Sequence, residues 1–344
     1  MSTLGAQPLD TARLADFLRR RGLGDGDGVR LQALSGGQSN PTYRLDSGPW
    51  RCVLRTKPPG PLQPSAHAID REYRVMDALR GTDVPVPQML AHCVDASVIG
   101  REFYLMDFVE GRVFVDQSLP GLAPAERGAL YDEMNRVIAA LHAVDYRAVG
   151  LDSFGKPGSY FTRQIGRWTR QCQASSLPLS SEMQALMDWL PQQIPADDET
   201  TLVHGDFRLD NLVFHPVEPR VVAVLDWELS TLGHPMADFA YHCMAWRIPA
   251  ALWRGVGGLD LRSLGIPSEA EHLRAYVQRT GRDAGAQWEF YMAYNLFRMA
   301  AILHGIGERA AQGNAAAADA METASKAAPL AAIGWRCAQR SGRA

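Results

Sequence analysis

Lysine is nearly missing from this sequence. Of its 35 basic residues only three are lysines, Lys57, Lys156 and Lys326, and the others are arginines. A site that needs a cation is therefore expected to use a guanidinium, which stays charged and binds phosphate through paired hydrogen bonds. Positive charge is not in excess either, because the net charge is −3. This balance gives no reason to expect a nucleic acid or an anionic membrane as a partner.

Long hydrophobic runs and paired cysteines are also absent. No apolar run approaches the roughly 20 residues that a membrane helix requires, and the N-terminal segment shows no basic leader followed by an apolar core. The five cysteines show neither a CxxC pair nor the spacing of metal ligands; they are Cys52, Cys93, Cys172, Cys243 and Cys337. Free thiols in a reducing compartment follow. We therefore expect a cytoplasmic protein with no membrane partner.

The most informative stretch is LVHGDFRLDNLVFHPVEPRVVAVLDWELSTLGHPMADFAY, residues 202–241. Short apolar segments at 201–203, 212–214 and 221–225 predict buried strands, with prolines in the turn between the last two. Asp206 and Asn211 then lie on the loop after the first strand, and Asp226 lies at the end of the third. His204 precedes Asp206 by two residues.

This order of polar groups suits phosphoryl transfer from ATP. That reaction needs a carboxylate to receive the proton of the acceptor hydroxyl and hard oxygen ligands to hold Mg²⁺. The spacing matches the kinase pattern H-x-D-x-x-x-x-N followed by a metal-binding Asp. HGDFRLDN followed by LDWE resembles the aminoglycoside-phosphotransferase-like kinases, the small-molecule branch of the protein-kinase fold. The alternative is that Asp and Asn occur here because both favour turns, and four matching positions together disfavour it.

The resemblance implies a role for each polar residue of the stretch. Asp206 would be the catalytic base, and Asn211 with Asp226 would bind Mg²⁺. His204 and Asp238 would have structural roles, bracing the catalytic loop. ATP and Mg²⁺ are thus the implied cofactors.

Two positions depart from the protein kinases. Gly205 replaces the Arg of H-R-D, and Trp227-Glu228 replaces the Phe-Gly that follows the metal-binding Asp. Both replacements are usual in the small-molecule branch. The replacements give no basis for assuming control by phosphorylation of an activation loop.

The resemblance also implies the fold class. We expect an α+β, bilobal protein-kinase-like fold, with a small N-terminal β-rich lobe at 1–110 and a larger, mainly helical C-terminal lobe at 111–344. Apolar periodicity predicts helices at 9–21, 67–79, 124–144, 269–280 and 287–308, and one further alanine-rich helix near the C-terminus. Strands are predicted at 29–34, 42–45, 51–55, 89–93 and 102–108.

A glycine-rich turn lies between the first two predicted strands. The segment SGGQSN stands where nucleotide kinases place their phosphate-covering loop, so Gly36, Gly37, Ser39 and Asn40 are candidate nucleotide contacts. Two glycines between strands are by themselves typical of an ordinary hairpin turn. The position upstream of a matching catalytic loop favours the nucleotide contact.

Kinases also carry a cation on the third strand, paired with a Glu from the next helix. Arg55 stands at this place, and Lys57, two residues later on the same face, is the second choice. Glu72 is the candidate partner. Alternatively, Glu72 pairs with Arg71 or Arg74 on a solvated helix face.

The adenine ring is expected to bind backbone groups of the segment that joins the lobes. Met106, Asp107 and Val109 are the candidates. Backbone recognition leaves no side-chain signature, so this expectation rests on the order of elements alone.

Arginines supply the candidates for an acceptor site. Arg163, Arg167 and Arg170 recur at helical spacing near Lys156, and Arg298 interrupts the apolar helix at 287–308. A basic row would suit an anionic acceptor such as a coenzyme A thioester, whereas a solvated basic face is the favoured alternative.

Three functions stay open at this point. The segment KPPGPLQPSAHAIDREYRV resembles kinases related to the domain fused to some acyl-CoA dehydrogenases, which suggests a hydroxyacyl-CoA or hydroxy acid as the small-molecule acceptor. An aminoglycoside or amino-alcohol kinase would need an acidic acceptor site instead. A non-catalytic nucleotide-binding module with a dehydrogenase partner would not need Asp206, Asn211 and Asp226 together.

Overall fold

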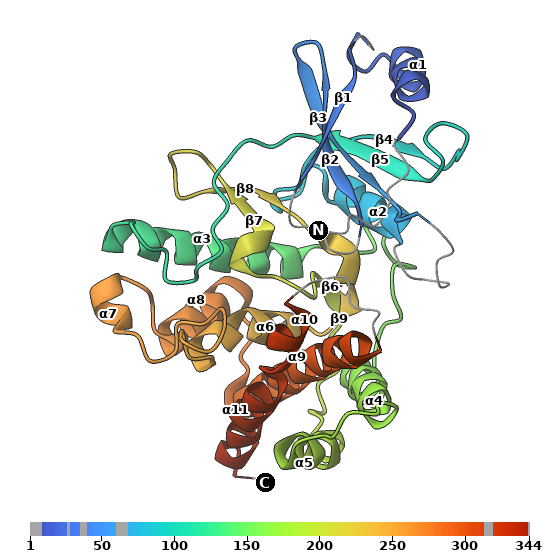
Figure 1. The fold of residues 1–344 in the computed structure, drawn as a ribbon. Helices are drawn as coiled ribbons and strands as arrows, with labels where there is room; N and C mark the ends of the chain where they lie inside the picture. Colours follow the sequence, from blue (N-terminus) through green and yellow to red (C-terminus); the bar gives the residue numbers. More distant parts are fainter. Residues whose placement is uncertain (1–8, 26–27, 35–39, 60–67, 313–318, 343–344) are drawn as a thin grey trace. The chain divides into compact units, whose positions relative to one another are not determined.

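The computed structural model describes residues 9–25, 28–34, 40–59, 68–312 and 319–342 (Figure 1). The chain forms two compact units. The first unit contains Met1–Gly111 together with Val222–Glu228, and the second contains Arg112–Val221 and Leu229–Ala344. The short segment Val222–Glu228 therefore carries Asp226 into the first unit.

The first unit is built on a five-stranded antiparallel sheet of order β1-β2-β3-β5-β4. Hairpin geometry sets the register of β2 and β3, because Ser47 pairs with Trp50 across a two-residue loop. The first loop residue, Gly48, has φ 57°, a conformation that glycine adopts without strain. The strands are β1 (Arg30–Ala33), β2 (Thr42–Ser47), β3 (Trp50–Thr56), β4 (Met89–Cys93) and β5 (Phe103–Asp107).

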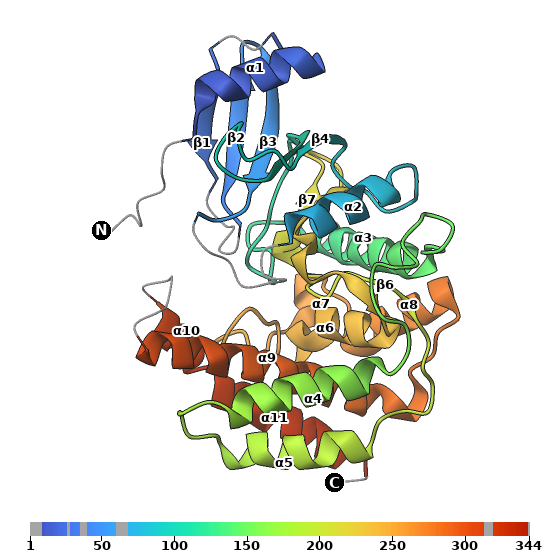
Figure 2. The ribbon, with the colours of Figure 1, turned by 90° about the vertical axis from the view of Figure 1, so that its right-hand side faces the viewer.

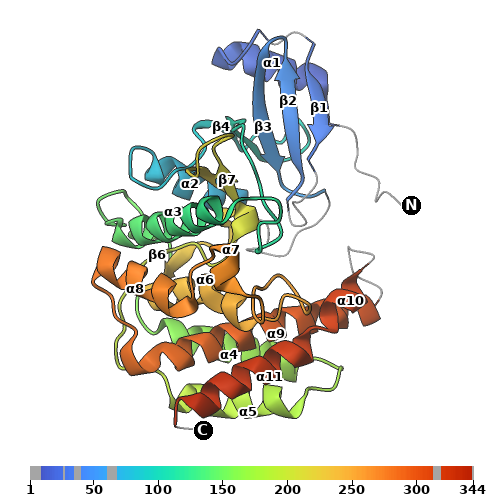
Figure 3. The same cartoon turned by 90° about the vertical axis from the view of Figure 1, so that its left-hand side faces the viewer.

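Helix α1 (Thr11–Arg21) covers one face of this sheet (Figure 2). Asp10 caps its N-terminus by accepting hydrogen bonds from the backbone of Ala12 and Arg13. Its apolar side packs on Cys52 and Leu54 of β3 within one buried cluster. Because side chains alternate along a strand, Arg55 lies on the opposite face, which Figure 3 presents to the viewer. Helix α2 (Ile69–Leu79) follows β3 in the chain.

The second unit is mainly helical. At its centre lies α9 (Trp288–Ala311), which is apolar and buried on nearly all sides. It packs against α4, α6, α10 and α11 (Figure 2). Helix α3 (Pro124–Ala143) packs against α8. The remaining helices are α4 (Tyr160–Gln173), α5 (Ser181–Trp189), α6 (Pro235–Arg247), α7 (Leu261–Leu264), α8 (Glu269–Thr280), α10 (Ala320–Ala324) and α11 (Ala327–Arg340).

The three short strands predicted at 201–203, 212–214 and 221–225 are present around Asp206, Asn211 and Asp226. Strand β6 (Thr201–Val203) pairs with β9 (Thr231–Gly233), a strand that the sequence did not indicate. Strand β7 (Leu212–Phe214) leads through a turn, in which His215 N donates to Arg220 O at 2.7 Å, to β8 (Val221–Val224). The α+β class predicted from the sequence is confirmed.

The prediction of a single alanine-rich helix at the C-terminus is wrong. Two helices, α10 and α11, meet at Ser325 and Lys326. Pro329 lies in the first turn of α11, where its missing N–H is tolerated. A continuous helix would place its ring against the carbonyl of Ser325, and the chain therefore breaks there.

All five cysteines are free and buried. Burial raises the pKa of Cys52 to about 12 and the pKa of Cys172 and Cys337 to about 11. Thiols with such values are very weak nucleophiles at neutral pH. No helix of the described residues is long and apolar enough to cross a membrane.

Two buried histidines in the second unit predict acid sensitivity. His242 Nε2 lies 3.0 Å from His272 Nε2, and burial lowers the pKa of His242 from 6.5 to about 4. Below pH 6.5 the unfolded chain binds a proton at His242 that the folded chain does not. Stability present above pH 6.5 is therefore lost as the pH falls towards 4, by about 2–3 kcal/mol at pH 4.5.

Urea denaturation at pH 7 and pH 4.5 measures this loss. His242→Gln removes the titrating group and should lose correspondingly less stability between the two pH values. An equal loss in the variant and the wild-type protein would assign the effect to other residues.

Candidate active site

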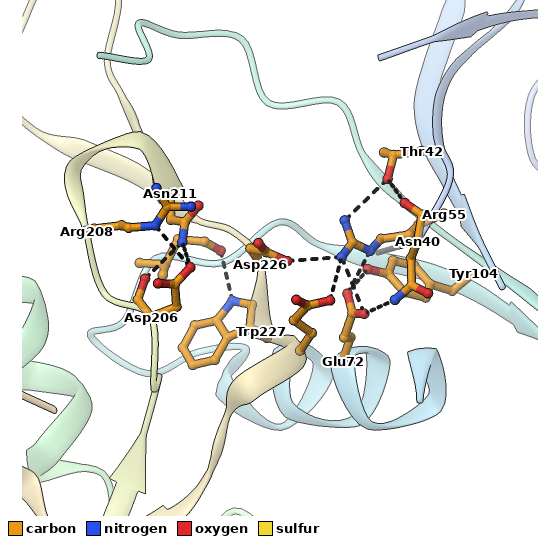
Figure 4. Close-up of polar contacts among 12 residues, drawn as sticks. Asn40, Thr42, Arg55, Glu72, Tyr104, Asp206, Arg208, Asn211, Asp226 and Trp227 are labelled. Carbon is orange, nitrogen blue, oxygen red and sulfur yellow. Dashed lines mark hydrogen bonds and ion pairs between the residues drawn. The ribbon is translucent and has the colours of Figure 1, made fainter. Parts of the chain in front are cut away.

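The loop between β6 and β7 places Asp206 among three donors. Its Oδ2 accepts hydrogen bonds from Arg208 Nε at 3.0 Å and Asn211 Nδ2 at 2.9 Å (Figure 4). Its Oδ1 accepts a short hydrogen bond from the hydroxyl of Tyr241, which lies on α6. Asn211 Nδ2 also donates to the Asp206 carbonyl oxygen at 2.9 Å, which closes the loop. The Asp206 carboxylate is thus fixed by donors while 15% of its side chain stays exposed.

Gly205 is required by the backbone of this loop. Its φ is 81°, and a Cβ added there would lie 2.7 Å from the carbonyl oxygen of Leu229. Any side chain would therefore meet both an unfavourable backbone conformation and a backbone atom that cannot move aside. This geometry explains why the loop cannot carry the Arg of the protein-kinase pattern.

Asp238 fixes the backbone of the loop at His204 and Gly205. It accepts hydrogen bonds from the backbone N–H of His204 at 2.7 Å and of Gly205 at 2.8 Å. His142 Nε2 lies 3.2 Å from the same carboxylate, and its Nδ1 lies 2.6 Å from the Tyr276 hydroxyl. Burial by itself raises the pKa of Asp238, but its hydrogen bonds with His142 and the charge there outweigh burial and keep that pKa below its ordinary value. The contacts therefore fit an ionised Asp238 carboxylate that holds the backbone of His204 and Gly205 in position.

His204 adds a second brace within the loop. It is fully buried, and its Nδ1 accepts a hydrogen bond from the backbone N–H of Asp206 at 3.2 Å. The backbone on both sides of Asp206 is therefore tied down. His142 was not indicated by the sequence, because it ends an ordinary apolar helix and has no motif spacing to Asp238.

Arg55 lies at the centre of a second group of polar residues, in the first unit, and forms ion pairs with two carboxylates. Its Nε lies 2.8 Å from Glu72 Oε2, an ion-pair contact whose direction is poor for a hydrogen bond. Its Nη2 donates to Asp226 Oδ1 at 3.0 Å (Figure 4). Burial would lower the pKa of Arg55, but Glu72 and the other neighbouring acids hold it above its ordinary value.

Glu72 is buried in this cluster, which excludes a place on a solvated helix face. It accepts hydrogen bonds from Asn40 Nδ2 at 2.7 Å and from the Tyr104 hydroxyl at 3.0 Å. Lys57, the second choice for the phosphate-binding cation, forms an ion pair with Glu102 instead. Of the two basic residues, Arg55 is the one that contacts both Glu72 and Asp226.

Asp226 adopts a left-handed backbone conformation, with φ 65°. Such a conformation in a residue other than glycine is uncommon and is concentrated at functional positions. The next residue, Trp227, anchors the turn, because its buried indole donates to Val224 O at 2.9 Å. The chain thus holds Asp226 in a strained position next to a fixed aromatic ring.

The oxygens expected to bind magnesium are free to do so. Within the described ranges, Asn211 uses its Nδ2 for hydrogen bonds and its Oδ1 for none. Asp226 uses Oδ1 for Arg55, and no described group bonds its Oδ2. Hard oxygens of this type fit Mg²⁺, which completes its coordination with water and phosphate oxygens. Asn211 belongs to the second unit and Asp226 to the first.

Of the predicted nucleotide contacts, Gly36, Gly37 and Ser39 lie outside the described residues. Met106 and Asp107 are the last residues of β5, and Asp107 N donates to Gln88 O at 2.9 Å. The backbone N–H of Asp107 is therefore already used in a hydrogen bond within the protein. Val109 follows beyond the strand.

The three arginines of α4 do not converge on a site. Arg163 donates to the carbonyl oxygens of Lys156 and Gly158, and Arg167 lies over the Trp168 ring at 4.9 Å. Arg167 and Arg170 are exposed. These contacts agree with the alternative favoured from the sequence, in which the arginines form a solvated basic face of the helix.

Arg298 differs from the α4 arginines, because it is 6% exposed. Its Nη2 donates to Gly205 O at 2.7 Å, and its guanidinium lies 5.0 Å from the Tyr241 ring. The sequence predicted Arg298 as a candidate acceptor-binding residue, because it interrupts an apolar helix. Sequence reasoning missed Arg208, whose place two residues after Asp206 was a usable signal, and Tyr241, for which no spacing signal exists.

The chain belongs to the phosphotransferase enzyme family, whose sequence profile matches residues 30–291. A crystal structure of a Ralstonia eutropha protein classed with the aminoglycoside phosphotransferases is similar, with 54% identity and a TM-score of 0.89, over 97% of this chain and 99% of that one. A microcompartment-associated aminopropanol kinase shares the fold, with 21% identity and a TM-score of 0.66, over 97% of this chain and 99% of that one. The kinase-like fold expected from the motif is thereby confirmed.

Curated relatives include longer proteins named for a different enzyme. Acyl-CoA dehydrogenase family member 10 of Mus musculus is 47% identical over 91% of this chain, which spans 30% of that protein. The protein from Arabidopsis thaliana named probable acyl-CoA dehydrogenase IBR3 is 45% identical over 82% of this chain, which spans 36% of it. The resemblance to kinase domains associated with dehydrogenases is confirmed by these matches.

Proposed function

We propose that the protein transfers the γ-phosphoryl group of ATP to a hydroxyl group of a small molecule. The observation that carries the proposal is the Asp206 carboxylate, which is fixed by Arg208, Asn211 and Tyr241 and yet partly exposed. A general base needs this combination of fixed geometry and access. Related structures support nucleotide use, since an aminoglycoside phosphotransferase of the same fold was crystallised with ADP and hygromycin B.

In this proposal the acceptor hydroxyl donates its proton to Asp206 as its oxygen attacks the γ-phosphorus. The new phosphorus–oxygen bond forms while the bond from the γ-phosphorus to the bridging oxygen breaks, and ADP leaves with that electron pair. Arg55 binds the nucleotide phosphates, and Glu72 holds its guanidinium in place. Asn211 and Asp226 would hold magnesium, which would supply positive charge to neutralise the phosphates.

A hydroxyacyl-CoA or a free hydroxy acid is the proposed acceptor. The names of the longer relatives support this choice, since they join the matching segment to acyl-CoA chemistry. An acyl-CoA dehydrogenase is the corresponding proposed partner. No acidic side chain other than Asp206 contacts Tyr241 or Arg298 in the described part of the chain, so this region offers little to a polycationic antibiotic.

A panel of acceptors tests the proposal. Mg²⁺-dependent release of ADP from ATP is measured with 3- and 4-hydroxyacyl-CoA thioesters, free hydroxy acids, an amino alcohol and an aminoglycoside, with Asp206→Ala as the blank. We expect turnover with an acyl compound. Turnover with amines alone would favour the amino-alcohol kinase, and tight binding of Mg·ATP without any turnover would favour the non-catalytic module.

A further inference from the structure

The hydrogen bonds of Asp206 leave one acceptor position open. A carboxylate offers about four lone-pair positions, two on each oxygen. Oδ2 is saturated by Arg208 Nε and Asn211 Nδ2, whereas Oδ1 accepts one bond, from Tyr241, within the part of the chain that the structure describes. A further donor can therefore bind only at Oδ1.

We infer that Oδ1 is the atom that receives the acceptor's proton, and that Tyr241 is a positioning residue that orients it. This inference rests on the proposed function, in which Asp206 is the base. The acceptor hydroxyl then bonds to Oδ1 beside the Tyr241 hydroxyl. When the acceptor oxygen attacks, its O–H bond breaks and the proton moves onto Oδ1, while Tyr241 keeps its own proton.

Tyr241 is itself fixed from several sides. It is 6% exposed on α6, and Arg298 of α9 lies over its ring at 5.0 Å. Arg298 also binds the carbonyl oxygen of Gly205, directly before Asp206, at 2.7 Å. One side chain of α9 thus restrains both the loop and the ring that orients its carboxylate.

The contact between α6 and α9 is fixed independently of the loop. Asn295 Nδ2 donates to Ala237 O at 2.9 Å, one helical turn before Tyr241. Tyr241 remains a donor at neutral pH, because burial and the Asp206 charge raise its pKa well above the ordinary value. The hydroxyl therefore cannot compete with Asp206 for the acceptor's proton.

Tyr241→Phe tests the inference, with Tyr131→Phe as the matched control. Tyr131 is also buried in the second unit, and its hydroxyl donates to Gln117 O at 2.7 Å, away from Asp206. In each variant we would measure kcat, the KM of the acceptor, the Kd of Mg·ATP, the melting temperature, and ADP release with water as the only acceptor. The last assay makes the comparison independent of the acceptor chosen.

We expect Tyr241→Phe to lower kcat by about 10- to 100-fold, the cost of a misplaced reacting group. The Kd of Mg·ATP should stay within about twofold, because the nucleotide does not bind Oδ1. The KM of the acceptor should change less than kcat, because the hydrogen bond to Oδ1 is only one of the contacts that bind the acceptor. Tyr131→Phe should melt at a comparable temperature and keep its kcat.

A Tyr241→Phe variant with the kcat of Tyr131→Phe would overturn the inference. So would a loss of kcat matched by an equal loss of Mg·ATP binding, since that would mark a structural role. Failure of the proposed function is recognised separately, because Asp206→Ala would then keep the wild-type rate of ADP release.

Discussion

Replacing Asp206 by alanine should lower the rate of phosphoryl transfer by about 10²- to 10⁴-fold, the usual contribution of a positioned proton acceptor. The affinity for nucleotide should change little, because Arg55, Glu72 and Asp226 form their cluster within the other unit. Single-turnover transfer of ³²P from ATP, together with titration of Mg·ATP, separates the two quantities. Equal losses of binding and transfer would contradict the role of Asp206 as base.

Asp210→Asn is the matched control for this experiment. Asp210 lies on the same loop and also accepts from Arg208, but its second partner is Arg254 at 2.9 Å. Its replacement changes the charge of the loop by the same amount and leaves the three donors of Asp206 in place. The control should keep most of the transfer rate, and its melting temperature shows how much of any effect is structural.

Removing the cation at Arg55 should have the second large effect, on stability as well as turnover. Arg55→Met would leave the carboxylate of Glu72, whose side chain is 2% exposed, buried without its ion-pair partner. Breaking a buried ion pair from one side costs about 3–5 kcal/mol. Turnover should be lost too, since the proposed phosphate contact disappears. Chemical denaturation and Mg·ATP titration measure the two effects.

The double variant Arg55→Met/Glu72→Gln separates these effects. Glutamine removes the charge at Glu72 but keeps an oxygen that Asn40 and Tyr104 can donate to. Most of the lost stability should return, because no unpaired charge stays buried, while turnover stays low. A double variant that regains turnover would show that Arg55 serves only to neutralise Glu72.

The sequence predicted most of the local structure, because the signals for it are local. Helix α8 begins and ends where the apolar periodicity predicted, at residues 269 and 280. The short strands around Asp206 and Asn211 are bounded by polar loop residues that can be recognised without a structure. The break between α10 and α11 was not predicted, because the only local signal for it is one proline, Pro329, in an alanine-rich segment.

Contacts between distant residues could not be predicted in this way. Arg55 lies 171 residues before Asp226 in the chain, and Tyr241 lies 35 residues after Asp206. Neither pair has a spacing that marks it, since both depend on how strands and helices pack. The kinase pattern identified the chemistry of Asp206, whereas the hydrogen bond from Tyr241 to its carboxylate emerged only from the structure.

The buried thiols offer an experimental advantage. All five cysteines are enclosed, and burial raises the pKa of Cys52 to about 12. The thiolate form is the nucleophile that attacks maleimides and spin-label reagents, so the buried thiols of the native chain should react with them very slowly. One engineered surface cysteine in each unit would therefore accept a fluorophore pair selectively. Energy transfer between the two dyes could then follow any domain motion that accompanies nucleotide binding in solution.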